Sequence, residues 1–205
     1  MHAWFSSCGG RGSVWLDAAV AVELIHRASL AHDDLPCMDN DPIRNGRPSL
    51  HREHGPSAAV LSGDAMIALA FGVLGRRSLP AEASVVLSET VVAMCAGQLA
   101  EQDGSSRWAA ICDQKTGSLF SAAARLGVLA AGHREDLMPA AHRFGCLMGR
   151  LYQLRDDHED GDPIPQDLGF CADDLRAGLL AITHGLADPQ PLLTFLGSVS
   201  SHLGH

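Results

Sequence analysis

The chain has 205 residues, of which 46% are hydrophobic, and its 15 Lys and Arg stand against 24 Asp and Glu. This length allows one substantial hydrophobic core, so we expect a single domain over residues 1–205. The net charge of −9 opposes general attraction to nucleic acid or to an anionic membrane surface. Carboxylates that converge in a cleft would instead recruit hard cations such as Mg²⁺ or Ca²⁺.

The six cysteines and the hydropathy indicate the compartment. No C-x-x-C pair occurs, so the sequence predicts neither a zinc site nor a disulfide scaffold. No uninterrupted apolar run reaches the roughly 20 residues that span a bilayer, and the first dozen residues lack the basic-then-apolar order of a signal peptide. We therefore expect a cytoplasmic protein without a transmembrane segment.

The expected elements are all helices. After a small, polar opening at residues 6–13, residues 14–35 contain no proline or glycine and carry an apolar stripe at helical spacing, which Pro36 ends. Further helices are expected at residues 58–74, 81–101, 108–131 and 137–159. The remainder predicts a loop followed by one or two short helices. No strand alternation is evident, so the expected fold class is all-α.

The first acidic cluster, at residues 32–41, reads HDDLPCMDND and holds four carboxylates within nine positions. Like charges at this density repel and raise one another's pKa, so a bound divalent cation is the natural compensation. The alternative is a solvated helix terminus, although carboxylates at a helix C-terminus oppose the helix dipole.

The second acidic cluster, at residues 153–160, reads QLRDDHED. Asp156 and Asp160 are one turn apart and share a helix face with Gln153. Carboxylate oxygens without a nitrogen ligand suit Mg²⁺ better than zinc. A charged helix end is the alternative for one such cluster. Two clusters that end two apolar helices favour metal binding.

The stretch from Glu23 to Asp41 resembles the first aspartate-rich motif of the trans-isoprenyl diphosphate synthases, and within them the geranylgeranyl diphosphate synthases. Matches continue in the family's order to Asp167, through residues 44–51, 59–65, 97–98, 115–120 and 153–160. The resemblance implies an isoprenoid synthase-type helical bundle around a central cavity, with the aspartate motifs on opposite walls. It also implies a homodimer.

The resemblance assigns roles to individual residues. The implied Mg²⁺ ligands are Asp33, Asp34, Asp39, Asp156, Asp157 and Asp160. The implied catalytic residues are Asp33, Asp34, Asp156, Asp157 and Lys115, and the implied substrate-binding residues are His26, Arg44, Asn45, His51, Gln98, Lys115, Thr116 and Gln153. Ala28 and Ser29 lie one turn deeper than Asp33, where small side chains would let a growing prenyl chain pass.

The implied chemistry explains these residue types. Breaking the allylic C–O bond leaves a carbocation and a diphosphate with extra negative charge, which Mg²⁺, Lys and Arg stabilise. The double bond of isopentenyl diphosphate then attacks the cation and a proton leaves. An apolar cavity excludes water that would quench the intermediate.

The chain also departs from the family's pattern. It is shorter than the family at both ends, and Gly9-Gly10-Arg11 only imitates a basic N-terminal segment because Arg11 lies 22 positions before Asp33. Asn45 replaces the second Arg of a pair, Glu101 replaces an Asp, and no Lys follows Lys115, although Gln166-Asp167 remains. The allylic half is thus intact and the isopentenyl half depleted.

The leading hypothesis is synthesis of a prenyl diphosphate, geranylgeranyl diphosphate being the expected product. One alternative is a non-catalytic or regulatory subunit of a heteromeric prenyl diphosphate synthase. Another is a terpene-synthase-like allylic diphosphate lyase, which needs the metal-binding half alone.

Overall fold

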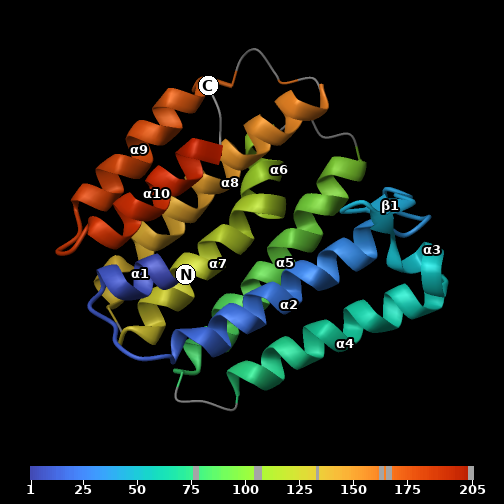
Figure 1. The fold of residues 1–205 in the computed structure, drawn as a ribbon, viewed down its shortest axis with the longest axis horizontal. Coiled ribbons are helices and arrows are strands. Elements are labelled where there is room, and N and C mark those ends of the chain that lie inside the picture. The colour runs from blue at the N-terminus through green and yellow to red at the C-terminus, as the bar shows by residue number, and fades with distance from the viewer. Residues whose placement is uncertain (76–78, 104–107, 133, 162–163, 165–167, 203–205) are drawn as a thin grey trace. The chain divides into compact units, whose positions relative to one another are not determined.

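The structure is a computed structural model that describes residues 1–75, 79–103, 108–132, 134–161, 164 and 168–202. Helices account for most of these residues, which confirms the all-α prediction (Figure 1). The chain divides into two compact units, one of residues 16–78 and the other of residues 1–15 and 79–205. The single domain expected over the whole chain stays a prediction.

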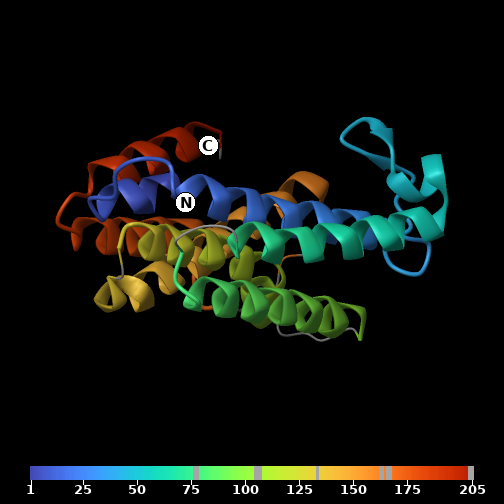
Figure 2. The same cartoon turned by 90° about the horizontal axis from the view of Figure 1, so that it is seen from below.

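The unit of residues 16–78 is built on two long helices, α2 (Trp15–Asp33) and α4 (Pro56–Leu74), close to the bounds expected from the sequence. They run alongside each other in both views (Figures 1 and 2). The His32 ring lies against α4 with its Nε2 3.1 Å from the Val60 carbonyl oxygen. Gly63 makes this contact possible, since a Cβ there would lie 2.0 Å from that Nε2.

A short hairpin and helix connect α2 to α4. Strand β1 (Ile43–Arg44) pairs antiparallel with β2 (Arg47–Pro48), and α3 (Leu50–His54) follows. The two turn residues, Asn45 and Gly46, have φ of 52° and 74°. Positive φ at both positions is typical of a type I′ turn, for which Asn-Gly is the preferred pair. Strands of two residues are too short for the alternation by which a sequence reveals them.

The other unit contains most of the helices. They are α1 (His2–Ser7), α5 (Glu82–Gln102), α6 (Trp108–Cys112), the π-helix η1 (Asp113–Gly117), α7 (Ser118–Ala130), the 3₁₀ turn η2 (Glu135–Leu137), α8 (Met138–Asp160), α9 (Ala172–His184) and α10 (Gln190–His202). Helix α8 packs on α7 and α9, while α1 packs on α7 and α10. Helix α1 was not expected from its polar surroundings, yet Trp4 and Phe5 are buried and Trp4 meets Phe144 edge-on at 5.5 Å.

Glycines bring α8 unusually close to its neighbours. A Cβ at Gly145 would lie 2.2 Å from the Ser121 Cα, and one at Gly149 would lie 2.3 Å from the Gly117 Cα. Real Cβ atoms do not approach this closely, so both positions require glycine at the observed separation. The close packing sets the acidic end of α8 beside the π-helix.

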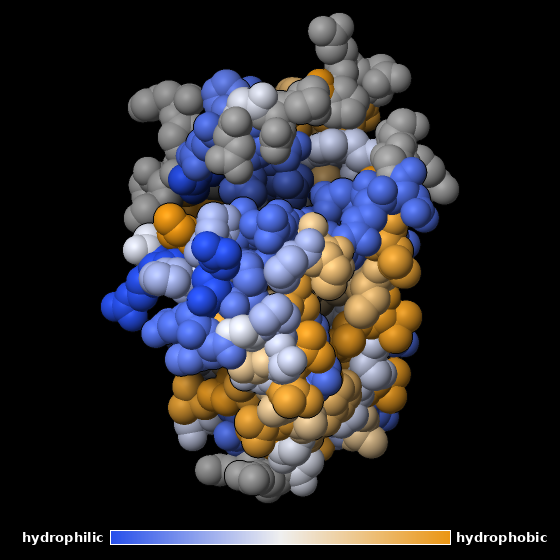
Figure 3. Space-filling view, turned by 90° about the vertical axis from the view of Figure 1, so that its right-hand side faces the viewer, coloured by the Kyte–Doolittle hydropathy of each residue, from blue (hydrophilic) through white to orange (hydrophobic). Residues whose placement is uncertain are grey.

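Helices α4 and α5 carry exposed apolar side chains. Val60, Leu61 and Leu69 are exposed on α4, and apolar side chains gather in the lower part of the face drawn in Figure 3. On α5 the exposed large apolar residues are Val85, Val92 and Leu99, which are seven positions apart and form one stripe. Helices α4 and α5 are both long and apolar enough to cross a membrane. Core helices of soluble proteins share this length and composition.

Candidate active site

The two acidic clusters predicted from the sequence lie in different units. The first belongs to the unit of residues 16–78, between α2 and β1, and the second ends α8 in the other unit.

The first cluster is a loop folded back onto the end of α2. Asp33 is the last residue of α2, and the Asp39 N–H donates to the Asp33 carbonyl oxygen at 2.9 Å. The Asn40 N–H similarly donates to the Leu35 carbonyl at 3.0 Å. The backbones of two predicted ligands, Asp33 and Asp39, thus lie next to each other.

Asp34 and Arg44 form an ion pair in this cluster that is buried at its carboxylate end. Asp34 is 2% exposed, and its Oδ1 accepts from Arg44 Nε at 2.9 Å and Nη2 at 2.5 Å. The same Nη2 donates to Asp41 Oδ2 at 2.8 Å. The hydrogen bond to Asp34 raises the pKa of Arg44, so this guanidinium stays charged. The hairpin thereby carries a cation to the acidic loop.

The other predicted residues of this unit differ in exposure. His26 is half-buried on α2, and its carbonyl accepts from the Ser29 hydroxyl at 2.9 Å. Ala28 is 1% exposed. His51 is buried, with its Nδ1 3.0 Å from the Ser49 hydroxyl, whereas Asn45 is exposed in the hairpin turn. Their substrate-binding and chain-length roles stay predictions.

In the other unit, Lys115 and Thr116 lie on the π-helix η1. The continuous α-helix expected at residues 108–131 was wrong at this point, because the backbone widens by one residue between α6 and α7. Gly97 of α5 packs against this turn, since a Cβ there would lie 2.6 Å from the Lys115 backbone nitrogen. Single π-turns inside α-helices are frequent at functional sites.

A chain of hydrogen bonds joins the π-helix to the second acidic cluster. The Thr116 hydroxyl donates to Gln153 Oε1 at 3.0 Å, and Gln153 Nε2 donates to Asp157 Oδ1 at 2.7 Å. The Trp108 indole Nε1 donates to Asp157 Oδ2 at 2.8 Å. Asp157 is 8% exposed, so both oxygens of a buried carboxylate are satisfied. No sequence motif pointed to Trp108.

Two further predicted residues lie near this chain. Lys115 Nζ donates to Glu101 Oε2 at 2.5 Å, so Glu101, an unusual residue for the resembled family, pairs with the predicted catalytic cation. Gln98 is 8% exposed, and its Nε2 has no hydrogen-bond partner within the described ranges. Asp156 is exposed. The Asp160 side chain and the Gln166-Asp167 pair lie outside the described residues.

The donor set is suited to Mg²⁺, although no three acidic, histidine or cysteine side chains of the described residues already converge as a metal site. Mg²⁺ is commonly held by one or two carboxylates together with substrate phosphates, so a preformed cage of three side chains is not required.

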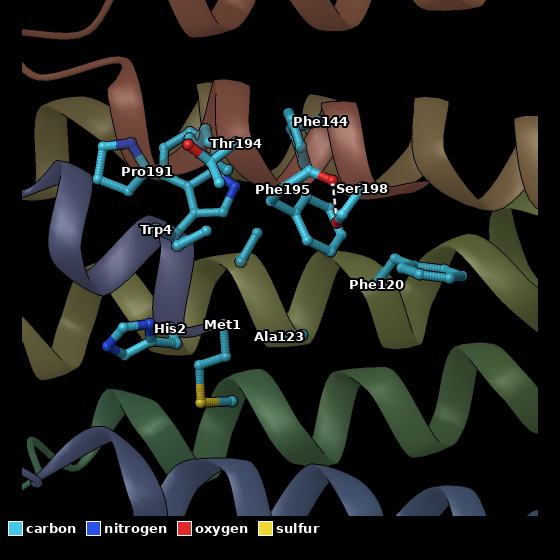
Figure 4. Close-up of a pocket in the computed structure, with 13 residues that line it drawn as sticks. Met1, His2, Trp4, Phe120, Ala123, Phe144, Pro191, Thr194, Phe195 and Ser198 are labelled. Carbon is cyan, nitrogen blue, oxygen red and sulfur yellow. Dashed lines mark hydrogen bonds between the residues drawn. The ribbon is translucent and has the colours of Figure 1, made fainter. Parts of the chain in front are cut away.

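A groove of about 570 Å³ lies in the unit of residues 1–15 and 79–205, between α1, α7, α8 and α10 (Figure 4). Aromatic side chains dominate it, namely Trp4, Phe120, Phe144 and Phe195. The Trp4 Nε1 is buried without a partner in the part of the chain that the structure describes. None of the residues predicted for the site lines this groove.

Comparison with known proteins identifies relatives over most of the chain. Residues 4–187 match the family model of polyprenyl synthetase. A geranylgeranyl diphosphate synthase from Cereibacter sphaeroides is 36% identical over 179 residues, 79% of this chain and 61% of that protein. The small subunit of a heterodimeric geranylgeranyl pyrophosphate synthase from Arabidopsis thaliana is 36% identical over 160 residues, 73% of this chain and 49% of that protein.

Solved structures show the same fold. A geranyltransferase from Legionella pneumophila is 28% identical, with a TM-score of 0.76 over 98% of this chain and 79% of its own. A geranyltranstransferase from Thermotoga maritima has a TM-score of 0.79 at 24% identity, covering 98% of this chain and 82% of its own. The chain spans about half to three fifths of the curated relatives it matches.

Proposed function

We propose a prenyltransferase function, on the premise that this chain belongs to the polyprenyl synthetase family. The proposed reaction condenses isopentenyl diphosphate with an allylic diphosphate. The proposed product is geranylgeranyl diphosphate, because similar proteins are named geranylgeranyl diphosphate synthases. The observation that carries the proposal is the π-turn of Lys115 and Thr116 against the acidic end of α8.

The chain's own residues supply binding and charge stabilisation. Diphosphate oxygens accept hydrogen bonds and gain negative charge as the allylic C–O bond breaks, so donors and cations aimed at them lower the barrier. The buried Gln98 amide offers an N–H without a partner among the described residues. Lys115 offers an ammonium that is 29% exposed and shared with Glu101. Arg44 offers a guanidinium already held in the acidic loop.

Mg²⁺ bound with the substrate would neutralise diphosphate charge and so assist C–O cleavage. We assign it to Asp33 and Asp39 on one motif and to Asp156 and Asp160 on the other. Asp34 and Asp157 also stay predicted ligands; in this structure Asp34 Oδ1 accepts from Arg44, and the two Asp157 oxygens accept from Gln153 and Trp108.

Product analysis tests the proposal. Purified protein is incubated with Mg²⁺, farnesyl diphosphate and labelled isopentenyl diphosphate, and the dephosphorylated products are separated by chromatography. A labelled twenty-carbon alcohol is the expected result. An unlabelled hydrocarbon or alcohol would identify a lyase instead. No consumption of either substrate would overturn the proposal for the isolated chain.

A subunit role is the second candidate, and the similarity to the Arabidopsis small subunit favours it. The depleted isopentenyl half, with Asn45 in place of Arg, agrees with a chain that modifies a partner's activity. Mixing the chain with a geranylgeranyl diphosphate synthase would test it. A changed rate or product ratio at a 1:1 ratio supports the subunit role, and an unchanged partner contradicts it.

We also propose that the chain forms a homodimer in the cytoplasm. The exposed apolar residues on α4 and on α5 need cover in a soluble protein, and a second copy would supply it. The six cysteines are free, which agrees with a reducing compartment. Val92→Glu should shift sedimentation at micromolar concentration from dimer to monomer, while Arg52→Glu on exposed α3 should not. A monomer in the unsubstituted protein would contradict the proposal.

A further inference from the structure

We propose that Trp108 is a positioning residue that holds the Asp157 carboxylate, which in turn fixes the polarity of the Gln153 amide in the diphosphate site. The inference deepens the proposed function and rests on it. Trp108 does not belong to any motif that the sequence suggested, and it lies 49 positions from the carboxylate to which it donates.

The chemistry of the four groups fixes the direction of every hydrogen bond. An indole N–H only donates and an ionised carboxylate only accepts. Asp157 therefore accepts from Trp108 at one oxygen and requires the NH₂ end of Gln153 at the other. This leaves the Gln153 carbonyl toward Thr116, whose hydroxyl donates to it. No alternative orientation of the amide satisfies all three contacts.

The orientation matters because a diphosphate accepts hydrogen bonds and offers none. The Gln153 NH₂ has two hydrogens, of which Asp157 takes one, so a second N–H remains for a ligand. Its carbonyl oxygen, which would repel a diphosphate, is already occupied by Thr116. A flipped amide would put the carbonyl where the N–H₂ now lies and would bring its lone pairs toward the Asp157 carboxylate.

Trp108 is itself held in place. Its ring lies 6.1 Å from that of Phe170, and the Arg150 guanidinium lies 5.3 Å from the same Phe170 ring. Arg150 is fixed in turn by two hydrogen bonds to Asp113, at 2.7 and 2.6 Å. An indole anchored on one face holds its N–H in a constant position, which a mobile exposed side chain does not.

Steady-state kinetics of matched variants test the proposal. Trp108→Phe removes the N–H and keeps an aromatic ring beside Phe170, and we expect the KM for the allylic diphosphate to rise about tenfold, as for loss of a charge-assisted hydrogen bond. The KM for isopentenyl diphosphate should stay within about twofold. Trp4→Phe makes the same substitution at an indole N–H that has no partner among the described residues and serves as control, with both KM values near those of the unsubstituted protein.

A double substitution separates positioning from general stabilisation. Gln153→Met removes the amide at similar length, so Trp108→Phe should add no further rise in KM in that background. Multiplicative effects would overturn the proposal, because they mean that Trp108 acts without Gln153. A rise in KM for both substrates with Trp108→Phe alone would also overturn it.

An NMR measurement separates failure of this inference from failure of the proposed function. The chain has three tryptophans, so ¹⁵N-labelled indole gives three N–H signals, assigned by single Trp→Phe variants. The Trp108 signal should lie downfield, resist hydrogen exchange and move upfield in Asp157→Asn. An unmoved signal overturns the inference even in an active enzyme. The expected shift in a protein that turns over no prenyl diphosphate would instead refute the function and leave the hydrogen-bond chain standing.

Discussion

Asn45 shows how a residue can be selected by backbone geometry where a motif would place a cation. Its φ of 52° lies in the left-handed region, where an L side chain other than Asn or Gly costs about 1 kcal/mol. We expect Asn45→Arg and Asn45→Ala each to lower the free energy of unfolding by about 1 kcal/mol. Asn45→Arg alone should also lower the KM for isopentenyl diphosphate, by adding a donor for its diphosphate.

Thermal unfolding and initial-rate measurements on both variants check this prediction. Asn45→Ala carries the backbone strain without the charge, so it is the matched control. Equal KM values in the two variants would mean that position 45 does not reach isopentenyl diphosphate.

The cysteines should differ sharply in reactivity. Burial raises the pKa of Cys112 to about 12, so at pH 8 only about one thiol in 10⁴ is ionised. Cys37 and Cys171 are exposed and lie outside the apolar stripe of α5. We expect iodoacetamide to alkylate these two within minutes and Cys112 only after denaturation, as followed by peptide mass spectrometry. Early labelling of Cys112 would mean that this part of the helix opens readily.

The candidate site could be predicted from the sequence where it depends on neighbouring residues. The acidic clusters and the Lys115-Thr116 pair are local patterns, and the structure shows them at helix ends and on the π-turn. The pairs that hold them were not predictable. Arg44 reaches Asp34 across 10 positions and Trp108 reaches Asp157 across 49, and such contacts depend on how the chain folds back.

At the scale of elements, the long helices were predictable because apolar periodicity runs between Gly, Pro and polar boundaries. The short helices α1 and α3 offer too few residues for that periodicity. The π-turn was not predictable for a different reason. Its hydrogen-bond register depends on close approach by Gly97 and Gly149, which come from two other helices.

Glycines at helix contacts should therefore respond oppositely to alanine according to their surroundings. At Gly63 a Cβ would meet the His32 ring, which can turn away only by losing its bond to Val60, so we expect Gly63→Ala to cost about 1–3 kcal/mol. At Gly145 the obstacle is the Ser121 backbone, and the cost should be larger. A Cβ added at Gly72 would meet no atom within 4 Å, so Gly72→Ala should raise the free energy of unfolding by about 0.4–1 kcal/mol.

Urea unfolding of the three variants measures these differences. Gly72 and Gly63 share helix α4, so the comparison holds helix propensity constant. If Gly72→Ala destabilises the protein as much as Gly63→Ala does, helix packing at Gly63 is not the cause of the destabilisation by Gly63→Ala.

At the scale of the whole molecule, the proposed reaction needs residues from both units. Asp33 belongs to the unit of residues 16–78 and Asp156 to the other, and the proposed reaction has both act in the same chemical step. When two residues act together in one step, the losses of activity from substituting each of them alone do not add up in the double variant. We therefore expect Asp33→Asn and Asp156→Asn each to lower kcat/KM about 10³-fold, and the double variant to be no worse than about tenfold beyond either.

Two exposed carboxylates on the same helices serve as controls. Glu23 on α2 pairs with Arg27, and Glu159 on α8 pairs with Arg155. Glu23→Gln and Glu159→Gln remove a similar charge from the same elements, so kcat/KM should stay within about twofold, since exposed ion pairs contribute little. Circular dichroism should show unchanged helix content in all variants. If the losses in Asp33→Asn and Asp156→Asn instead multiply to about 10⁶-fold in the double variant, the two clusters act independently and the proposed common step is wrong.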